Sequence, residues 1–168
     1  LLTKDKISAL KSIWHKSEKK IIIVGQHLPD DQVLLLLTEM ATQDTVVLTE
    51  TTSNMFSKYF VSHIDQVLTQ INGQNEHLFY PDLVMSIGGP IVSKKIKAWL
   101  RNGKDYQHWH ISLDHRAPNT FFHLKEHIQS EESEVLKWLQ NKNVSVSKYV
   151  QDWKKIVKQA RKLHKLFI

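Results

Sequence analysis

Short apolar runs alternate along the chain with segments in which apolar residues recur at intervals of three or four positions. Three of these runs, at residues 20–25, 45–49 and 83–87, consist almost entirely of apolar and β-branched residues. Such runs are typical of strands that are buried on both faces, as in a parallel sheet covered by helices. Two further strands are predicted at residues 107–113 and 120–124.

Apolar residues at helical spacing fill most of the remaining chain. Ile7, Leu10 and Ile13, for example, would lie on one stripe of a helix. Helices are predicted at residues 4–15, 33–40, 62–71, 92–100, 131–139 and 148–166. Because strands and helices alternate, the pattern indicates βαβ units with right-handed crossovers. The expected fold is α/β: a Rossmann-like open parallel sheet of five to six strands with helices on both faces.

A single domain over residues 1–168 is expected. No linker rich in proline or glycine divides the chain, and its 168 residues suit one domain of ordinary size. The polar stretch at residues 141–147 is interpreted as a connector to the terminal helix. The chain starts at Leu1 rather than at methionine, which agrees with its being a piece of a longer protein.

Composition excludes some classes of protein. No apolar run approaches the roughly 20 residues of a membrane-spanning helix, so membrane insertion is not expected. The chain has no cysteine, which excludes disulfides and thiolate metal sites and favours a cytoplasmic location. The net charge is +6, and the predicted terminal helix carries a run of basic residues: Lys154, Lys155, Lys158, Arg161, Lys162 and Lys165.

Two interpretations of this basic helix are open. It is the solvated face of an amphipathic helix, which we favour, or it is a basic surface that binds an anionic partner such as nucleic acid. No zinc-finger, RNP or basic-zipper pattern accompanies it. Nucleic acid is therefore not an expected partner.

Candidate ligand-binding residues follow the predicted strands, because open parallel sheets bind ligands beyond the carboxyl ends of their strands. The candidates are Gln26, Thr51, Gly88, Gly89 and Asp114. Gly88 and Gly89 could present backbone N–H groups to a phosphate, or they form a tight turn that needs glycine, which we favour. Neither the G-x-G-x-x-G nor the G-x-x-x-x-G-K-[ST] pattern occurs, which disfavours nicotinamide binding and P-loop hydrolysis.

Two histidines, His108 and His110, would lie on the same face of one strand. Two imidazoles could bind a metal, but no third ligand is evident, and we interpret them as edge-strand or surface histidines. The serines lie in no nucleophile-elbow pattern. We therefore predict no metal site and no catalytic residue within the chain.

One stretch carries a family resemblance. Residues 81–100, PDLVMSIGGPIVSKKIKAWL, are similar to a strand, Gly-Gly turn and helix of the MenD family of thiamine-diphosphate enzymes. Residues 109–114, a strand that ends in aspartate, and Arg116-Ala117-Pro118 resemble the segments that follow in that family. The resemblance extends over about residues 4–163 and concerns the central domain of a three-domain enzyme.

The resemblance implies a bacterial transferase of menaquinone biosynthesis. Its parent enzyme would join isochorismate to a thiamine-bound succinic semialdehyde unit derived from 2-oxoglutarate. Thiamine diphosphate and Mg²⁺ would be held by flanking pyrimidine- and pyrophosphate-binding domains, in a parent that is a homo-oligomer. The Gly-Asp-Gly motif of the pyrophosphate domain is absent from these 168 residues.

The chain by itself is accordingly expected to be inactive and to bind no cofactor. It would act as a scaffold whose ligand-facing residues are vestigial. The resemblance makes Lys142 and Lys148 candidates for binding substrate carboxylates. The alternative is a working nucleotide- or FAD-binding central domain of another thiamine-diphosphate enzyme.

Overall fold

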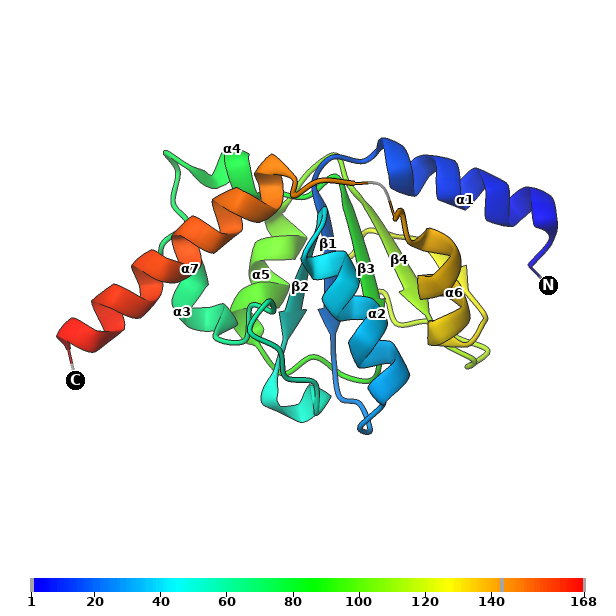
Figure 1. Cartoon of the computed structure of the whole chain (residues 1–168), viewed down its shortest axis with the longest axis horizontal. Helices are drawn as coiled ribbons and strands as arrows, with labels where there is room; N and C mark the ends of the chain where they lie inside the picture. The colour runs from blue at the N-terminus through cyan, green and yellow to red at the C-terminus, as the bar shows by residue number, and fades with distance from the viewer. Residues whose placement is uncertain (1, 143, 168) are drawn as a thin grey trace.

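The computed structural model describes residues 2–142 and 144–167. The sheet contains β1 (Lys20–Val24), β2 (Thr45–Thr49), β3 (Leu83–Ile87), β4 (Gln107–Ile111) and β5 (Leu124–Ile128). The α-helices are α1 (Lys4–Lys16), α2 (Asp31–Ala41), α3 (Ile64–Leu68), α4 (Glu76–Phe79), α5 (Lys94–Asn102), α6 (Glu132–Leu139) and α7 (Lys148–Leu166), and η1 (Thr51–Ser53) is a 3-10 helix. Figure 1 shows α1 and α7 at opposite ends of the long axis.

The five strands form one parallel sheet in the order β2-β1-β3-β4-β5. This arrangement confirms the predicted α/β fold. Helices lie on both sides of the sheet, and the carboxyl ends of β1 and β2 point downward in Figure 1. The side chains of successive residues on each strand enter different cores, since they point to opposite faces.

Two hydrophobic cores flank the sheet. Ile22 and Val24 pack with side chains of α1, α2 and α6 on one face. Ile21 and Ile23 pack with side chains of α3, α5 and α7 on the other. Each fully buried large apolar side chain stabilises the fold by about 1.5–3 kcal/mol, so both faces of the strands contribute.

Helix starts are marked by side chains that cap the first free N–H groups. Thr3, Asp30, Ser93 and Ser147 each accept a hydrogen bond from a backbone N–H three residues later. Because Ser93 is such a cap, α5 begins two residues after the predicted start at residue 92.

The fifth strand was predicted at the wrong place. Residues 120–124 were expected to form it, but β5 is Leu124–Ile128. Phe121 is buried and packs on the ring of His108, and Phe122 has a left-handed backbone with φ of 64°. An extended strand cannot continue through that conformation. The true strand has exposed and half-buried residues, which hides it from a search for apolar runs.

Other elements also differ from the prediction. β4 ends at Ile111 rather than at residue 113. The helix predicted at residues 62–71 is the short α3, and α4 was not predicted at all. α7 agrees with its predicted range, and residues 144–147 of the predicted connector are not helical, whereas residue 143 lies outside the described residues.

None of the helices in the described part of the chain is long and apolar enough to cross a membrane.

Candidate functional site

The loops that follow β1 and β3 meet beyond the carboxyl ends of their strands. The strand order reverses direction at β1, so the space between these two loops is where open α/β sheets usually bind a ligand. Here backbone hydrogen bonds close it. The N–H of Gln26 donates to the Pro90 carbonyl at 3.1 Å, and the N–H of Gly89 donates to the Gln26 carbonyl at 2.7 Å.

This close approach requires glycine. A Cβ atom on Gly25 would lie 2.0 Å from the carbonyl oxygen of Gly89, which is a severe clash between backbones. Gly88 has a φ of +78°, and a Cβ there would lie 2.8 Å from the Gln26 carbonyl oxygen. The geometry agrees with the interpretation of Gly88 and Gly89 as a tight turn.

Glu132, in the first turn of α6, joins both loops. Its Oε1 accepts a hydrogen bond from the Gly88 N–H at 3.2 Å, and its Oε2 lies 2.5 Å from Nε2 of His27. The other ring nitrogen of His27 lies 2.5 Å from the Leu28 carbonyl oxygen. Burial alone would lower the pKa of His27, but these hydrogen bonds and the negative charges of Glu132 and Asp30 together raise the pKa above its ordinary value.

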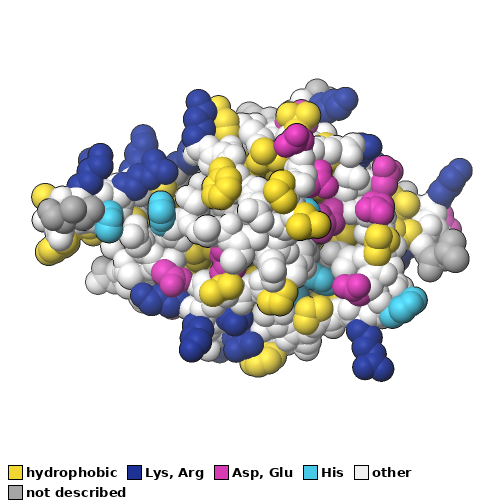
Figure 2. Space-filling model, turned by 90° about the horizontal axis from the view of Figure 1, so that it is seen from below, with side chains coloured by type: hydrophobic (Ala, Val, Ile, Leu, Met, Phe, Trp, Pro, Cys, Tyr) yellow, Lys and Arg dark blue, Asp and Glu magenta, His cyan; other side chains and the backbone are white. Residues whose placement is uncertain are grey.

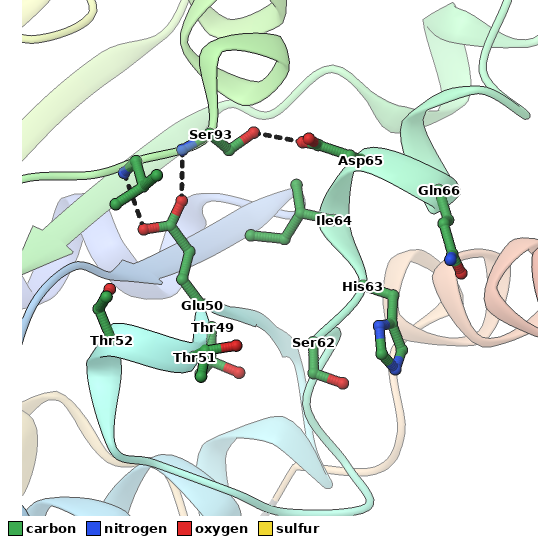
Figure 3. Close-up of a pocket in the computed structure, with 11 residues that line it drawn as sticks. Thr49, Glu50, Thr51, Thr52, Ser62, His63, Ile64, Asp65, Gln66 and Ser93 are labelled. Atoms are coloured by element: carbon green, nitrogen blue, oxygen red, sulfur yellow. Dashed lines mark hydrogen bonds between the residues drawn. The ribbon is translucent and has the colours of Figure 1, made fainter.

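Glu50, directly after β2, binds the start of α5 (Figure 3). Its two carboxylate oxygens accept hydrogen bonds from the N–H groups of Val92 at 2.9 Å and Ser93 at 2.6 Å. The Ser93 hydroxyl donates to Asp65 at 2.5 Å. Backbone N–H groups at a helix start are where an anion such as phosphate would bind. The carboxylate of Glu50 occupies this position at α5, and Glu132 binds the Gly88 N–H in the loop that precedes it.

A cavity of about 370 Å³ lies beside Glu50, between the end of β2 and the starts of α3 and α5. Most of its lining residues are polar, and Val92 is one of the exceptions. Figure 3 labels the others: Thr49, Glu50, Thr51, Thr52, Ser62, His63, Ile64, Asp65, Gln66 and Ser93. The Glu50 carboxylate is already bound to backbone N–H groups, and Asp65 to the Ser93 hydroxyl. The cavity therefore offers hydroxyl and amide groups and the imidazole of His63, while its two carboxylates already have partners.

The structure brings three of the five predicted ligand-facing residues together: Gln26, Gly88 and Gly89. Thr51 lies in the adjoining cavity. Asp114 is exposed beyond β4, where its backbone carbonyl accepts a hydrogen bond from the Gln129 side chain at 2.9 Å, and it does not line that cavity.

The two candidate substrate lysines lie away from this site. α7 begins near the amino ends of the strands, because the Ser147 N–H donates to the carbonyl of Gln43, just before β2. Lys148 is exposed and pairs with Asp152 at 3.0 Å. Lys142 is also exposed. Neither residue lines the cavity beside Glu50.

Sequence reasoning did not identify Glu132 or Glu50 as site residues. Glu132 is 44 residues from Gly88 and 105 from His27, so no local pattern links them. Glu50 lies in a polar stretch directly after a strand, which was a usable signal.

The interpretation of His108 and His110 as edge-strand or surface residues was wrong. β4 lies between β3 and β5, and both histidines are buried. The Ser86 hydroxyl lies 2.7 Å from a ring nitrogen of each. Burial, reinforced by neighbouring histidines, lowers the pKa of His108 to about 3. These residues form a neutral polar cluster inside the core.

The loops beyond β1, β2 and β3 do not suit the diphosphate of a thiamine-diphosphate cofactor. A diphosphate needs free backbone donors or cations in a recess, whereas Glu132 and Glu50 already bind the N–H groups of Gly88, Val92 and Ser93. Among residues 2–142 and 144–167, no three His, Cys, Asp or Glu side chains are grouped so that they could hold a metal ion.

Comparison with known proteins gives consistent matches. A family model described as "Middle domain of thiamine pyrophosphate" matches residues 3–168. The chain is 42% identical over 119 residues to the 2-succinyl-5-enolpyruvyl-6-hydroxy-3-cyclohexene-1-carboxylate synthase of Christiangramia forsetii, covering 67% of the chain and 20% of the relative. The synthase of Flavobacterium johnsoniae is 39% identical over 145 residues, covering 82% and 25%.

A more distant relative covers more of the chain. The synthase of Porphyromonas gingivalis is 32% identical over 163 residues, which are 91% of this chain and 28% of the relative. The chain thus spans between 20% and 28% of the length of these three relatives. Since the family model covers nearly every residue, the chain belongs to the middle-domain family of thiamine pyrophosphate enzymes.

Proposed function

We propose that this chain is the central, scaffolding domain of a 2-succinyl-5-enolpyruvyl-6-hydroxy-3-cyclohexene-1-carboxylate synthase. The names of the relatives support this assignment, as does the coverage of one portion of each. The parent enzyme would condense isochorismate with the thiamine-bound unit formed from 2-oxoglutarate. Its flanking domains would hold thiamine diphosphate and Mg²⁺.

One observation carries the scaffolding role: carboxylates of the protein fill the anion-binding positions of the sheet. The N–H groups of Gly88, Val92 and Ser93 all donate to Glu132 or Glu50. A donor that already has a charged acceptor gains little from exchanging it for a phosphate. The same observation counts against the alternative of a working nucleotide- or FAD-binding domain.

The surface beyond the carboxyl ends of the strands supports contact with other parts of the parent. An exposed large apolar side chain follows each of the first four strands: Leu28, Phe56, Val92 and Leu113, between 64% and 82% exposed. Figure 2 shows hydrophobic side chains spread over the middle of the face seen from below, with lysines and arginines near its margins. Apolar surface of this kind is typical of protein contacts.

The remaining assignments stay predictions. These are the homo-oligomeric state of the parent, its cytoplasmic location, and the binding of substrate carboxylates by Lys142 and Lys148. For Lys148, a Lys148→Ala variant of the parent enzyme would be decisive. A KM for isochorismate raised at least about tenfold, with kcat unchanged, would support the role, because a lost contact to a bound carboxylate weakens binding.

The proposal is tested with the parent protein and the 168-residue chain side by side. With thiamine diphosphate and Mg²⁺, the parent should consume isochorismate and 2-oxoglutarate in equal amounts. The chain alone should show no turnover, no calorimetric heat with thiamine diphosphate and no retained flavin. Binding of either cofactor to the chain would contradict the scaffolding role, and absence of the condensation in the parent would contradict the assigned reaction.

A further inference from the structure

His27 is anchored by the loop that follows β2. It lies in the connection from β1 to α2, at the lower end of the molecule in Figure 1. Its backbone N–H donates to the Thr52 carbonyl at 3.1 Å, and its carbonyl accepts a hydrogen bond from the Asn54 side chain at 2.7 Å. The main chain of His27 is therefore held on both sides, and its side chain is only 12% exposed.

Both ring nitrogens of His27 face hydrogen-bond acceptors. Nδ1 lies 2.5 Å from the Leu28 carbonyl oxygen, and Nε2 lies 2.5 Å from Oε2 of Glu132. A carbonyl oxygen and an ionised carboxylate accept hydrogen bonds and donate none. A neutral imidazole carries one N–H and satisfies only one of these acceptors, whereas an imidazolium carries two and satisfies both. The two contacts together therefore require the cationic ring.

The charged groups around the ring favour the same form. Glu132 belongs to α6, and Asp30 caps the start of α2, so carboxylates of two helices act on His27. The loops after β1 and β2 contribute uncharged residues, which line the adjoining cavity: Gln26, Leu28, Thr52 and Asn54. Although burial opposes the charge, the net effect raises the pKa of His27 above its ordinary value. The ring therefore stays protonated to a higher pH than a free histidine.

We propose that His27, Leu28 and Glu132 form a pH-sensitive latch: the imidazolium ties the Leu28 carbonyl to α6, and loss of one proton releases that carbonyl. The Leu28 oxygen is released rather than Glu132, because a hydrogen bond to a charged acceptor is the stronger of the two. Glu132 is also fixed by the Gly88 N–H. The latch consists of residues of this chain alone and does not rest on the proposed function.

Release of this carbonyl changes the surface beyond the carboxyl ends of the strands. The Leu28 side chain is 82% exposed there, and its peptide bond leads into Pro29, which has no N–H to hold the segment. The main chain of His27 stays anchored by the loop after β2, and α2 stays capped by Asp30. The change is therefore confined to residues 28 and 29, and the exposed Leu28 side chain takes a different direction when His27 is neutral.

A pH titration of the 168-residue chain tests the latch. Long-range ¹H–¹⁵N spectra distinguish an imidazolium from either neutral tautomer. Both ring nitrogens of His27 should carry a proton at low pH, and the midpoint of the titration should lie above about 6.5, the ordinary value for histidine. The ¹³C signal of the Leu28 carbonyl should change with the same midpoint. A neutral His27 ring at about pH 6, or a Leu28 signal that does not follow the ring, would overturn the proposal.

Matched variants of α6 identify the partner of the ring. Glu132→Gln keeps an oxygen for the Gly88 N–H but removes the charge beside His27, so the midpoint should fall by at least about one pH unit. Glu134→Gln removes a charge from an exposed position of the same helix and should shift the midpoint by under about 0.2 units.

A third variant, His27→Gln, links the ring to the carbonyl. The Leu28 carbonyl signal should then no longer change over this pH range. Equal midpoints in the Glu132 and Glu134 variants, or a Leu28 signal that still titrates without His27, would overturn the latch.

Discussion

Two regions of this chain carry positive charge or partial positive charge, and they differ in whether carboxylates of the chain bind them. Beyond β3, the backbone N–H groups that could bind an anion donate to Glu132 and Glu50. Along α7, the cations Lys154, Lys158 and Arg161 have no carboxylate partner among the described residues. In the first region carboxylates of the same chain bind the N–H groups, whereas in the second the cations face solvent.

The difference separates a region whose polar groups stabilise the fold from one whose charges face solvent. Charge-assisted hydrogen bonds to a carboxylate stabilise a structure only if both partners belong to it. At the Gly88–Ser93 loop both do, so its donors serve the fold. The cations of α7 are exposed and lie three and four residues apart, so they repel one another and cost a little folding energy. Substitutions in the two regions should therefore have opposite effects.

The largest loss of stability is expected where the loop after β1 touches the loop after β3. Gly25→Ala places a Cβ 2.0 Å from the Gly89 carbonyl oxygen, and neither backbone can move freely. The free energy of unfolding should fall by about 3 kcal/mol or more, as for severe overpacking. Urea titration measures it. Gly73→Ala is the control, because no atom lies within 4 Å of its Cβ position, and it should change stability by under about 0.5 kcal/mol.

Removal of the Glu50 carboxylate should turn the loop before α5 into an anion-binding site. Glu50→Ala leaves the N–H groups of Val92 and Ser93 without their acceptor and should cost about 2 kcal/mol. Sodium sulfate should then stabilise this variant more than it stabilises the wild type, since sulfate can bind the freed donors. Thermal unfolding at matched ionic strength measures this, with the exposed Glu134→Ala as control. An equal response of both proteins to sulfate would mean that the loop is not an anion site.

Acid should destabilise the core through His108. Its pKa is about 3 in the folded chain and near 6.5 when unfolded, so the unfolded state binds the proton first as the pH falls. The contribution of neutral His108 is present above pH 6.5 and is lost progressively below it, by about 2 kcal/mol between pH 7 and 5. His27, whose pKa is raised, acts in the opposite sense, and its contribution is lost as the pH rises.

The variant His108→Gln isolates this effect, because its amide can replace the ring nitrogen beside Ser86. Its free energy of unfolding should depend less on pH than that of the wild type, by the same ~2 kcal/mol between pH 7 and 5. The exposed His77→Gln serves as the comparison. An unchanged pH dependence in the His108 variant would show that this histidine is not held neutral.

The smallest changes in stability are expected on α7, where Lys154 and Lys158 repel each other and Lys148 pairs with Asp152. Lys154→Gln/Lys158→Gln should leave stability unchanged or raise it by up to about 0.5 kcal/mol at low salt, since like charges are removed. Lys148→Gln should lower it by about 0.3–0.5 kcal/mol, since it breaks the pair with Asp152. Chemical unfolding with and without added salt measures both. Destabilisation by the double variant would mean that Lys154 and Lys158 have partners within the fold.

Local patterns were sufficient for most of the fold. β1, β2 and β3 are fully buried runs, and the sequence shows them directly because both faces need apolar side chains. β5 was misplaced because Leu124–Ile128 has exposed and half-buried residues, while the apolar Phe121 nearby packs from a loop. A pattern of apolar residues reports burial, and burial does not always mean a strand.

The candidate site was predictable only in part, for a similar reason. Gly88 and Gly89 were recognised, since the need for glycine is a property of the local backbone. Their partners were not, because Glu132 and Gln26 reach them only after the strands have paired. The cavity beside α7 was not predictable either, because one wall comes from that helix and the opposite wall from residues 58–61.

The sequence by itself determined the α/β class, the buried strands and the lack of cofactor motifs, because each depends on residues close together in the chain. Only the tertiary structure decided which charges are neutralised. Coulombic and hydrogen-bonding interactions depend on distance in space, and residues such as His27 and Glu132 become neighbours only through the order of the strands.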